Sequence, residues 1–199
     1  LRRNGTISPS DKIRIGCIGL GWQGPGNMDN FLSEQDALIV AVCDIDKNHL
    51  AENKKTVDTY YGNTDCTPYH DYKELLARKD IDAVSIALPD HWHAIAAVDA
   101  ARAGKDIYGE KPLSHNLHEG RAICDAVKRY GRVWQTGSWQ RSQSNFRFAS
   151  ELVRNGRIGN VHTVEIGLPS GQSNFDGLSD QFMDVPPELD YETWLGPAP

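Results

Sequence analysis

Three glycines near the amino terminus have the spacing of a phosphate-binding turn. Gly19, Gly21 and Gly24 form a G-x-G-x-x-G pattern, with Trp22 and Gln23 between the second and the third. In a dinucleotide-binding turn the first glycine permits the tight turn, the second lets the backbone approach a pyrophosphate, and the third lets helix pack on strand. The helix that follows presents N–H groups and a partial positive charge to the phosphates. Because glycine-rich turns also occur elsewhere, the surrounding sequence has to decide the interpretation.

An acidic residue stands where a dinucleotide-binding unit needs one. The apolar run 37–43 predicts a strand, and Asp44 follows it directly, about twenty residues after the last glycine of the turn. A carboxylate at this position accepts hydrogen bonds from the adenosine ribose. The alternative is that Asp44 only caps the next helix, a role that Asp46 can fill equally well. The order strand, turn, helix, strand and acid favours the cofactor interpretation.

A lysine at a later strand end has the chemistry to accept a proton. Glu110, Lys111 and Pro112 follow the predicted strand 106–109. Loss of hydride from a carbinol carbon requires a proton acceptor within hydrogen-bond reach of the hydroxyl, and a lysine amine can be that acceptor. Pro112 makes the preceding bond a candidate cis peptide, which would turn Lys111 inward. Glu110 either pairs with Lys111, reaches the cofactor, or is a plain surface acid.

Two histidines raise the question of a metal site. His91 and His93 follow Asp90 at the start of an expected helix. Residues two apart do not share a helix face, and no cysteine or further carboxylate cluster lies nearby in the sequence. We therefore predict no metal site and interpret His91 as a solvated residue of the first helical turn.

Strands and helices alternate through the first two thirds of the chain, which predicts an α/β fold with a Rossmann-type doubly wound parallel sheet. The run 83–88 is apolar nearly throughout, as in a strand covered on both faces. Ligands bind such sheets outside the carboxyl ends of the strands, so the turn, the acid and the lysine should meet at one edge. The expected helix-opening residues after the first helix are Asp46, Asp71, Asp90 and Ser114.

The pattern changes after about residue 140. We expect an irregular lead-in over 1–11, a Rossmann dinucleotide-binding domain over 12–140, and over 141–199 the incomplete beginning of an α+β second domain for substrate binding and oligomerisation. A helix is expected around 146–155. Residues 161–168 alternate apolar with polar side chains, which predicts the first strand of that domain. The later residues are proline-rich and lack a period, so their packing partners are expected in sequence beyond the chain.

The bulk composition excludes several classes of protein. A net charge of −6 without a basic cluster argues against a nucleic-acid partner, and no apolar run is long enough to span a membrane. Cys17 and Cys43 lie in expected strands and Cys124 on a helix face, a distribution typical of buried hydrophobic residues rather than of a disulfide framework or a zinc site. The chain begins without methionine, so we expect a removed export signal and a periplasmic location, with the cytoplasm as the alternative.

These residues together resemble the Gfo/Idh/MocA family of NAD(P)-dependent oxidoreductases. The resemblance covers about residues 12–168 and is carried by the turn 19–24, Asp44, the segment 89–93 and, most specifically, the Glu-Lys-Pro motif 110–112. Residues 194–199 also resemble a subgroup whose members often carry twin-arginine export signals.

The resemblance implies a Rossmann domain followed by an α+β domain that binds a sugar or polyol and through which subunits pair, giving a homo-oligomer. It implies that Leu88, Pro89 and His93 line the nicotinamide ribose. It also implies a catalytic aspartate and histidine on a later helix, which cannot be matched before the chain ends. The predicted catalytic residue is Lys111, and the predicted cofactor-binding residues are Gly19, Gly21, Trp22, Gln23, Gly24, Asp44, Leu88, Pro89, His93, Glu110 and Lys111.

Three functions are compatible with this pattern. The first is an NAD-dependent oxidoreductase that transfers hydride between a sugar or polyol hydroxyl and the nicotinamide. The second, known in the same family, is a glycosidase that uses bound NAD for transient oxidation, elimination and re-reduction. The third is a nucleotide-binding module without turnover.

Overall fold

The computed structural model describes residues 8–168 and 182–198, and its contacts divide the chain into two units. The first, which we call the Rossmann unit, comprises Leu1–Gly137 together with Pro186–Pro199, and the second unit is Ser138–Val185. The division between the two units lies at Gly137/Ser138, whereas the predicted boundary lies after residue 140. The assignment of 186–199 differs from the expected one, because no local pattern in the sequence indicates that this segment contacts the Rossmann unit.

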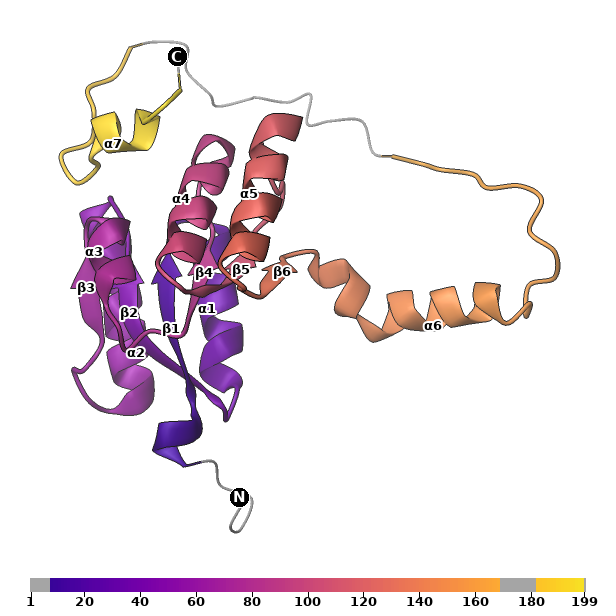
Figure 1. The fold of residues 1–199 in the computed structure, drawn as a ribbon, viewed down its shortest axis with the longest axis horizontal. Coiled ribbons are helices and arrows are strands. Elements are labelled where there is room, and N and C mark those ends of the chain that lie inside the picture. Colours follow the sequence, from indigo (N-terminus) through magenta and orange to yellow (C-terminus); the bar gives the residue numbers. More distant parts are fainter. Residues whose placement is uncertain (1–7, 169–181, 199) are drawn as a thin grey trace. The chain divides into compact units, whose positions relative to one another are not determined.

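A six-stranded parallel sheet forms the centre of the Rossmann unit, as predicted (Figure 1). Its spatial order is β3-β2-β1-β4-β5-β6, so the order reverses between β1 and β4. This reversal is the topological switch point of a doubly wound fold, where a crevice opens outside the strand ends. The strands are β1 Ile13–Ile18, β2 Ala37–Cys43, β3 Thr67–Tyr69, β4 Ala83–Ile86, β5 Asp106–Gly109 and β6 Trp134–Thr136.

Helices cover both faces of the sheet (Figure 1). On one face, Met28 and Val57 of the first two helices pack in one apolar cluster, and on the other, Leu75, Ala100 and Ala126 of the next three pack in another. Burial of both strand faces explains the nearly continuous apolar runs in the sequence. The helices are α1 Gln23–Ser33, α2 Lys47–Tyr61, α3 Tyr72–Ala77, α4 Asp90–Arg102 and α5 Leu117–Arg129.

The expected helix caps are partly confirmed. The Asp46 carboxylate accepts hydrogen bonds from two N–H groups of α2, and Asp71 accepts one from Lys73 N. The prediction that Asp90 caps α4 is wrong, because Asp90 is the first helical residue.

The predicted opening of α5 by Ser114 is also wrong, because the N-cap is Asn116. The Asn116 side chain accepts from Glu119 N, and the Glu119 carboxylate accepts in turn from Asn116 Nδ2 and His115 N. An acid three residues after the cap completes this reciprocal arrangement, which Ser114 cannot make.

The second unit contains the 3₁₀ helix η2 Trp139–Ser142 and the helix α6 Ser144–Arg154, which confirms the helix expected there. The strand predicted at 161–168 is wrong, since these residues are exposed and form no strand. Alternation of side chains indicates only which face a strand would bury, whereas a strand forms only when its backbone pairs with a neighbour. Of the expected lead-in and tail, residues 1–7, 169–181 and 199 lie outside the described residues.

All cysteines are free thiols, and three of them, Cys17, Cys43 and Cys66, are buried. Burial raises the pKa of each of these thiols, that of Cys66 to about 11. The prediction that Cys124 is a buried hydrophobic residue is wrong, because its position on α5 is exposed whereas the neighbouring Ile123 is buried. No helix within the described residues is long and apolar enough to cross a membrane.

Candidate functional site

The turn between β1 and α1 can be built only with glycine at two of its positions. Gly19 has a φ of +84°, and a Cβ there would lie 2.3 Å from the Ala87 carbonyl oxygen. A Cβ on Gly24 would lie 1.8 Å from the Gly19 carbonyl oxygen. Neither contact can relax without moving backbone, so the first and third glycines of the pattern are required by the packing of the turn itself.

Gly21 is different, because the protein itself does not require a glycine there. A Cβ at Gly21 would meet nothing closer than the His49 ring, at 3.8 Å. Beside it α1 begins with Trp22 as N-cap, and no side chain caps this helix end. Gln23 and the 95 % exposed Trp22 border the same open space. Bare backbone next to an uncapped helix N-terminus fits an anionic group such as a pyrophosphate.

Asp44 lies at the end of β2 against this turn. Its Oδ2 accepts a hydrogen bond from Leu20 N at 2.6 Å, and its Oδ1 accepts one from Asp46 N at 2.8 Å. The alternative that Asp44 caps the next helix is wrong, because that cap is Asp46. Asp44 is half-buried, and each of its oxygens retains a lone pair that could accept a ribose hydroxyl.

Glu110 is not a surface acid, because it is only 5 % exposed. Its Oε1 accepts from Asn27 Nδ2 at 3.0 Å, and its Oε2 accepts from the backbone N of Lys111 at 3.1 Å. Asn27 accepts in turn from Gln23 Nε2 at 3.1 Å. Sequence reasoning missed Asn27; its place one helical turn after Gln23 could have indicated the bond between these two side chains, but not the distant partner Glu110. These hydrogen bonds connect α1, the helix that follows the glycine turn, to the end of β5.

His93, on α4, holds the Glu-Lys-Pro motif 110–112 at its Pro112 end. Its Nδ1 lies 2.5 Å from the Pro112 carbonyl oxygen, and since a carbonyl only accepts, Nδ1 carries the proton. In the neutral ring, His93 Nε2 is then an acceptor, and this buried atom has no partner among the described residues. Such an unpaired acceptor fits the predicted wall of a ribose, whose hydroxyls can donate. The Lys111–Pro112 bond is cis, as predicted, and the Lys111 side chain is exposed.

Leu88 and Pro89 connect β4 to α4 and are half-buried. A Cβ on Gly19 would lie 3.1 Å from Leu88 Cδ2, so this loop borders the glycine turn. His91, interpreted above as a solvated residue of the first turn, is half-buried, and its Nε2 donates to the Trp194 carbonyl at 2.9 Å. A contact so distant in sequence left no local pattern to detect. The edge of the sheet thus collects all the predicted site residues in the Rossmann unit.

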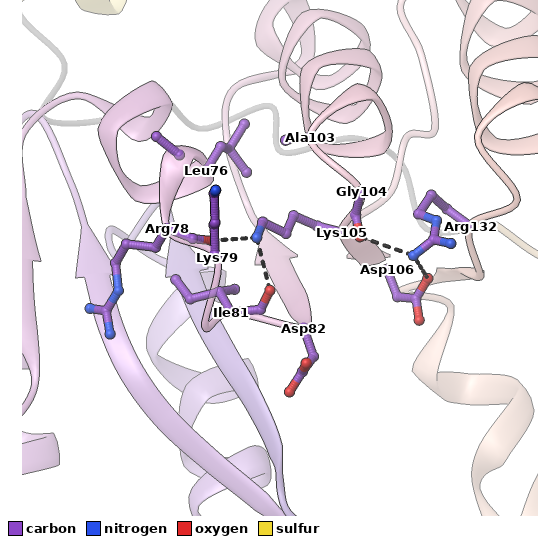
Figure 2. Close-up of a pocket in the computed structure, with 11 residues that line it drawn as sticks. Leu76, Arg78, Lys79, Ile81, Asp82, Ala103, Gly104, Lys105, Asp106 and Arg132 are labelled. Atoms are coloured by element: carbon purple, nitrogen blue, oxygen red, sulfur yellow. Dashed lines mark hydrogen bonds and ion pairs between the residues drawn. The ribbon is translucent and has the colours of Figure 1, made fainter.

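A pocket lies at the amino ends of the strands, opposite the edge with the glycine turn, and its charged side chains have structural roles (Figure 2). Two of its lining residues, Asp82 and Asp106, lie at the amino ends of β4 and β5, far from the edge with the glycine turn. Lys105 Nζ donates to the Ile81 carbonyl at 2.8 Å, and Arg132 Nη1 donates to the Gly104 carbonyl at 2.9 Å. These side chains satisfy backbone carbonyls between strands, and burial lowers the pKa of the Lys105 amine.

Within the ranges that the structure describes, no group of three or more His, Cys, Asp or Glu side chains could hold a metal ion.

Comparison with known proteins agrees with this geometry. Residues 13–138 match the model of an oxidoreductase family with an NAD-binding Rossmann fold. The myo-inositol 2-dehydrogenase of Thermotoga maritima is 31% identical over 154 residues, which are 77% of this chain and 44% of that relative. The glycosyl hydrolase family 109 protein 2 of Shewanella sp. (strain ANA-3) is 36% identical over 130 residues, 62% of this chain and 28% of that relative.

A solved structure shares the fold. The scyllo-inositol dehydrogenase of Lactobacillus casei with bound cofactor NAD(H) and scyllo-inositol superposes with a TM-score of 0.67 at 26% identity, over 75% of this chain and 43% of that one. The chain therefore spans less than half the length of these relatives. The predicted NAD-binding Rossmann fold is confirmed, and the chain belongs to the Gfo/Idh/MocA oxidoreductase family.

Proposed function

We propose that the protein is an NAD-dependent oxidoreductase that transfers hydride between a sugar or polyol hydroxyl and the nicotinamide. The observation that carries this proposal is the anchoring of Lys111. Its backbone N donates to buried Glu110, and the following Pro112 carbonyl accepts from buried His93, while the lysine side chain is exposed. An exposed amine on a main chain held by hydrogen bonds, at the edge that carries the glycine turn, is well placed to meet a substrate hydroxyl.

The residues of this edge divide the work between binding and proton transfer. The backbone of 19–24 and the start of α1 would hold the pyrophosphate, and Asp44 would accept from the adenosine ribose. Leu88, Pro89 and His93 would form the wall of the second ribose. The bound cofactor would supply the hydride acceptor. Lys111 would take the hydroxyl proton as the carbonyl forms, which keeps the substrate oxygen from developing a full positive charge.

The relatives support a cyclic polyol as the substrate class. Two of them are named as inositol dehydrogenases, and one was solved with scyllo-inositol and NAD(H) bound. An inositol ring carries only secondary hydroxyls, and removal of hydride and a proton from one of them gives a ketone.

A glycosidase that uses NAD without net consumption is the second candidate. It is favoured by the relatives named as glycosyl hydrolase family 109 proteins, whose identity of 36% exceeds that of the inositol dehydrogenase relative, although over a shorter alignment. Such an enzyme would use the same lysine for proton transfer, so the site alone does not distinguish the two reactions.

One pair of assays on the full-length protein separates these functions. Inositols and sugars are supplied with NAD and net NADH formation is followed, and aryl glycosides are supplied with catalytic NAD and aglycone release is followed. NADH formation supports the dehydrogenase, and aglycone release without net NADH supports the glycosidase. Binding of NAD with neither activity would favour a module without turnover and contradict both.

A further inference from the structure

The segment 186–198 belongs to the Rossmann unit although it follows the second unit in sequence. Its short helix α7 spans Tyr191–Leu195. Figure 1 shows α7 in yellow, at the end of the chain. The segment touches the Rossmann unit at three places, and each of them adjoins a loop at the carboxyl edge of the sheet.

The first contact lies just after Asp44. Lys47 N donates to the Glu188 carbonyl at 3.1 Å, and Asp190 N donates to the Ile45 carbonyl at 3.3 Å. These bonds flank an antiparallel bridge between residues 46 and 189. The segment thereby adds a short piece of backbone pairing to the loop whose carboxylate we assign to the adenosine ribose.

The second contact is a hydrogen bond between side chains at the end of β3. Asp190 Oδ2 lies 2.9 Å from His70 Nε2, and its two oxygens also accept from Thr193 N and Oγ1. The hydrogen bond from His70, with those from Thr193, lowers the pKa of Asp190 to about 2. This end of β3 is itself joined to the same loop, because Asp44 N donates to the Tyr69 carbonyl.

The third contact is with the start of α4, just after Leu88 and Pro89. The Trp194 carbonyl accepts from His91 Nε2 at 2.9 Å and from Trp92 Nε1 at 3.2 Å. The Trp92 indole also fills the space beside Gly196, where a Cβ would lie 2.4 Å from the ring. The contact therefore depends on close packing as well as on hydrogen bonds.

These contacts join loops that lie on opposite sides of β1 in the sheet. The contacts after β2 and β3 are on one side, and the contact at α4 follows β4 on the other. The glycine turn follows β1, between them. We propose that residues 188–196 form a clamp that fixes the spacing of the Asp44 loop and the Pro89 loop, and that Asp190 and Trp92 are positioning residues for the dinucleotide. This inference rests on the proposed use of that edge for NAD.

We expect the clamp to affect the affinity for NAD rather than the rate of hydride and proton transfer. A binding site whose two walls are already held at their bound spacing loses less conformational entropy when the ligand arrives. Release of one wall should therefore weaken binding of NAD and leave the proton-transfer groups in place.

The test uses three variants of the full-length protein: His70→Ala, Asp190→Ala and Trp92→Phe, the last of which removes the indole N–H donor and part of the ring that packs beside Gly196. We measure the Kd of NAD and of ADP-ribose by calorimetry, and the unfolding temperature of each variant. Each variant should bind both ligands about two- to fivefold more weakly, the size expected when one partly exposed contact is lost. The double variant His70→Ala/Asp190→Ala should bind NAD no more weakly than the weaker-binding of the two single variants, because both substitutions remove the same His70–Asp190 contact.

The matched control is Arg102→Ala, which removes the ion pair with Asp99 at the far end of α4, of similar exposure. It should leave both affinities unchanged. Unchanged NAD affinity in all three folded variants overturns the clamp, and so does an equal loss in the control. If an alanine variant does not fold, Trp92→Phe decides by the same criterion. A wild-type protein that does not bind NAD overturns the proposed function as well, which separates the two failures.

Discussion

The Asn27 side chain of α1 donates a hydrogen bond of 3.0 Å to the carboxylate of Glu110, at the end of β5. Both residues are almost fully buried. This bond couples the helix that begins at the glycine turn to the main chain of Lys111, so the cofactor half and the proton-transfer half of the site share one polar connection.

Removal of this connection should destabilise the fold. Asn27→Ala leaves one oxygen of a buried carboxylate without its donor, and loss of a hydrogen bond to a charged group costs about 1.5–3 kcal/mol. We expect that decrease in the free energy of unfolding in urea. Asn30→Ala, an exposed position of the same helix, is the control and should change it by less than about 0.5 kcal/mol. Equal effects at both positions would contradict the role of the Asn27–Glu110 bond.

The glycines should separate folding from cofactor binding. Gly24→Ala forces a Cβ into the Gly19 carbonyl and should destabilise the protein by about 1–3 kcal/mol. Gly21→Ala meets no such obstacle, so the protein should fold normally but bind NAD at least about tenfold more weakly, because the new methyl group occupies the approach to the backbone. Gly26→Ala, also in open space but inside α1, should leave NAD affinity unchanged and should stabilise the protein by up to about 1 kcal/mol, as alanine does in place of a helical glycine. Calorimetric titration measures NAD affinity, and urea unfolding measures the free energy of unfolding. Normal NAD affinity in Gly21→Ala would place the pyrophosphate elsewhere.

Asp44 should select NAD over NADP. Two like unit charges about 4 Å apart at an effective dielectric constant of 20 repel by roughly 4 kcal/mol, and even a third of that is about tenfold in affinity. The residues after Asp44 are Ile45 and Asp46, so no arginine is there to neutralise a 2′-phosphate. We expect NADPH to bind at least about tenfold more weakly than NADH in parallel titrations. Equal or tighter binding of NADPH would refute this assignment.

Lys111 should matter for turnover far more than for cofactor affinity. Positioned acid–base catalysis contributes about 10²–10⁴-fold, so Lys111→Ala in the full-length enzyme should lower kcat by about that factor. NAD affinity should change little, because the phosphates are held at the glycine turn. Steady-state kinetics with the preferred polyol and a separate NAD titration provide the two values. Lys111→Met with a near-normal kcat and a raised KM would show that the lysine only orients the substrate.

Stability in acid should depend on Asp80. A hydrogen bond from Arg78, with a second from Arg14, holds the pKa of this carboxyl well below its usual range. A carboxyl whose pKa is lower in the folded state stabilises the protein above its unfolded pKa of about 3.9, and this contribution is lost as the pH falls through the folded value. The difference in unfolding free energy between wild type and Asp80→Asn should therefore be largest above about pH 5 and shrink toward pH 3. A difference that is constant over this range would contradict the coupling.

The sequence predicts the Rossmann unit well because its signals are local. The glycines at 19 and 24, the acid at 44 and the apolar strands each follow from steric or hydrogen-bonding needs that neighbouring residues reveal. The Asn27–Glu110 bond and the His91–Trp194 contact could not be predicted, since each joins positions far apart in the chain. The strand expected at 161–168 failed for a related reason, because alternation cannot supply the hydrogen-bonding neighbour that a strand requires.

The uneven burial of the four thiols makes the native chain chemically addressable at one place. Only a thiolate reacts readily with alkylating or disulfide reagents, and the pKa values of Cys17, Cys43 and Cys66 are all raised by burial. Of the four thiols, Cys124 is the one that is exposed to solvent, and it lies on α5, away from the glycine turn in the sequence and in the sheet order. A fluorescent label introduced through Cys124 would mark the Rossmann unit at a single known position without mutation, and could report its rotation, assembly or proximity to another labelled molecule.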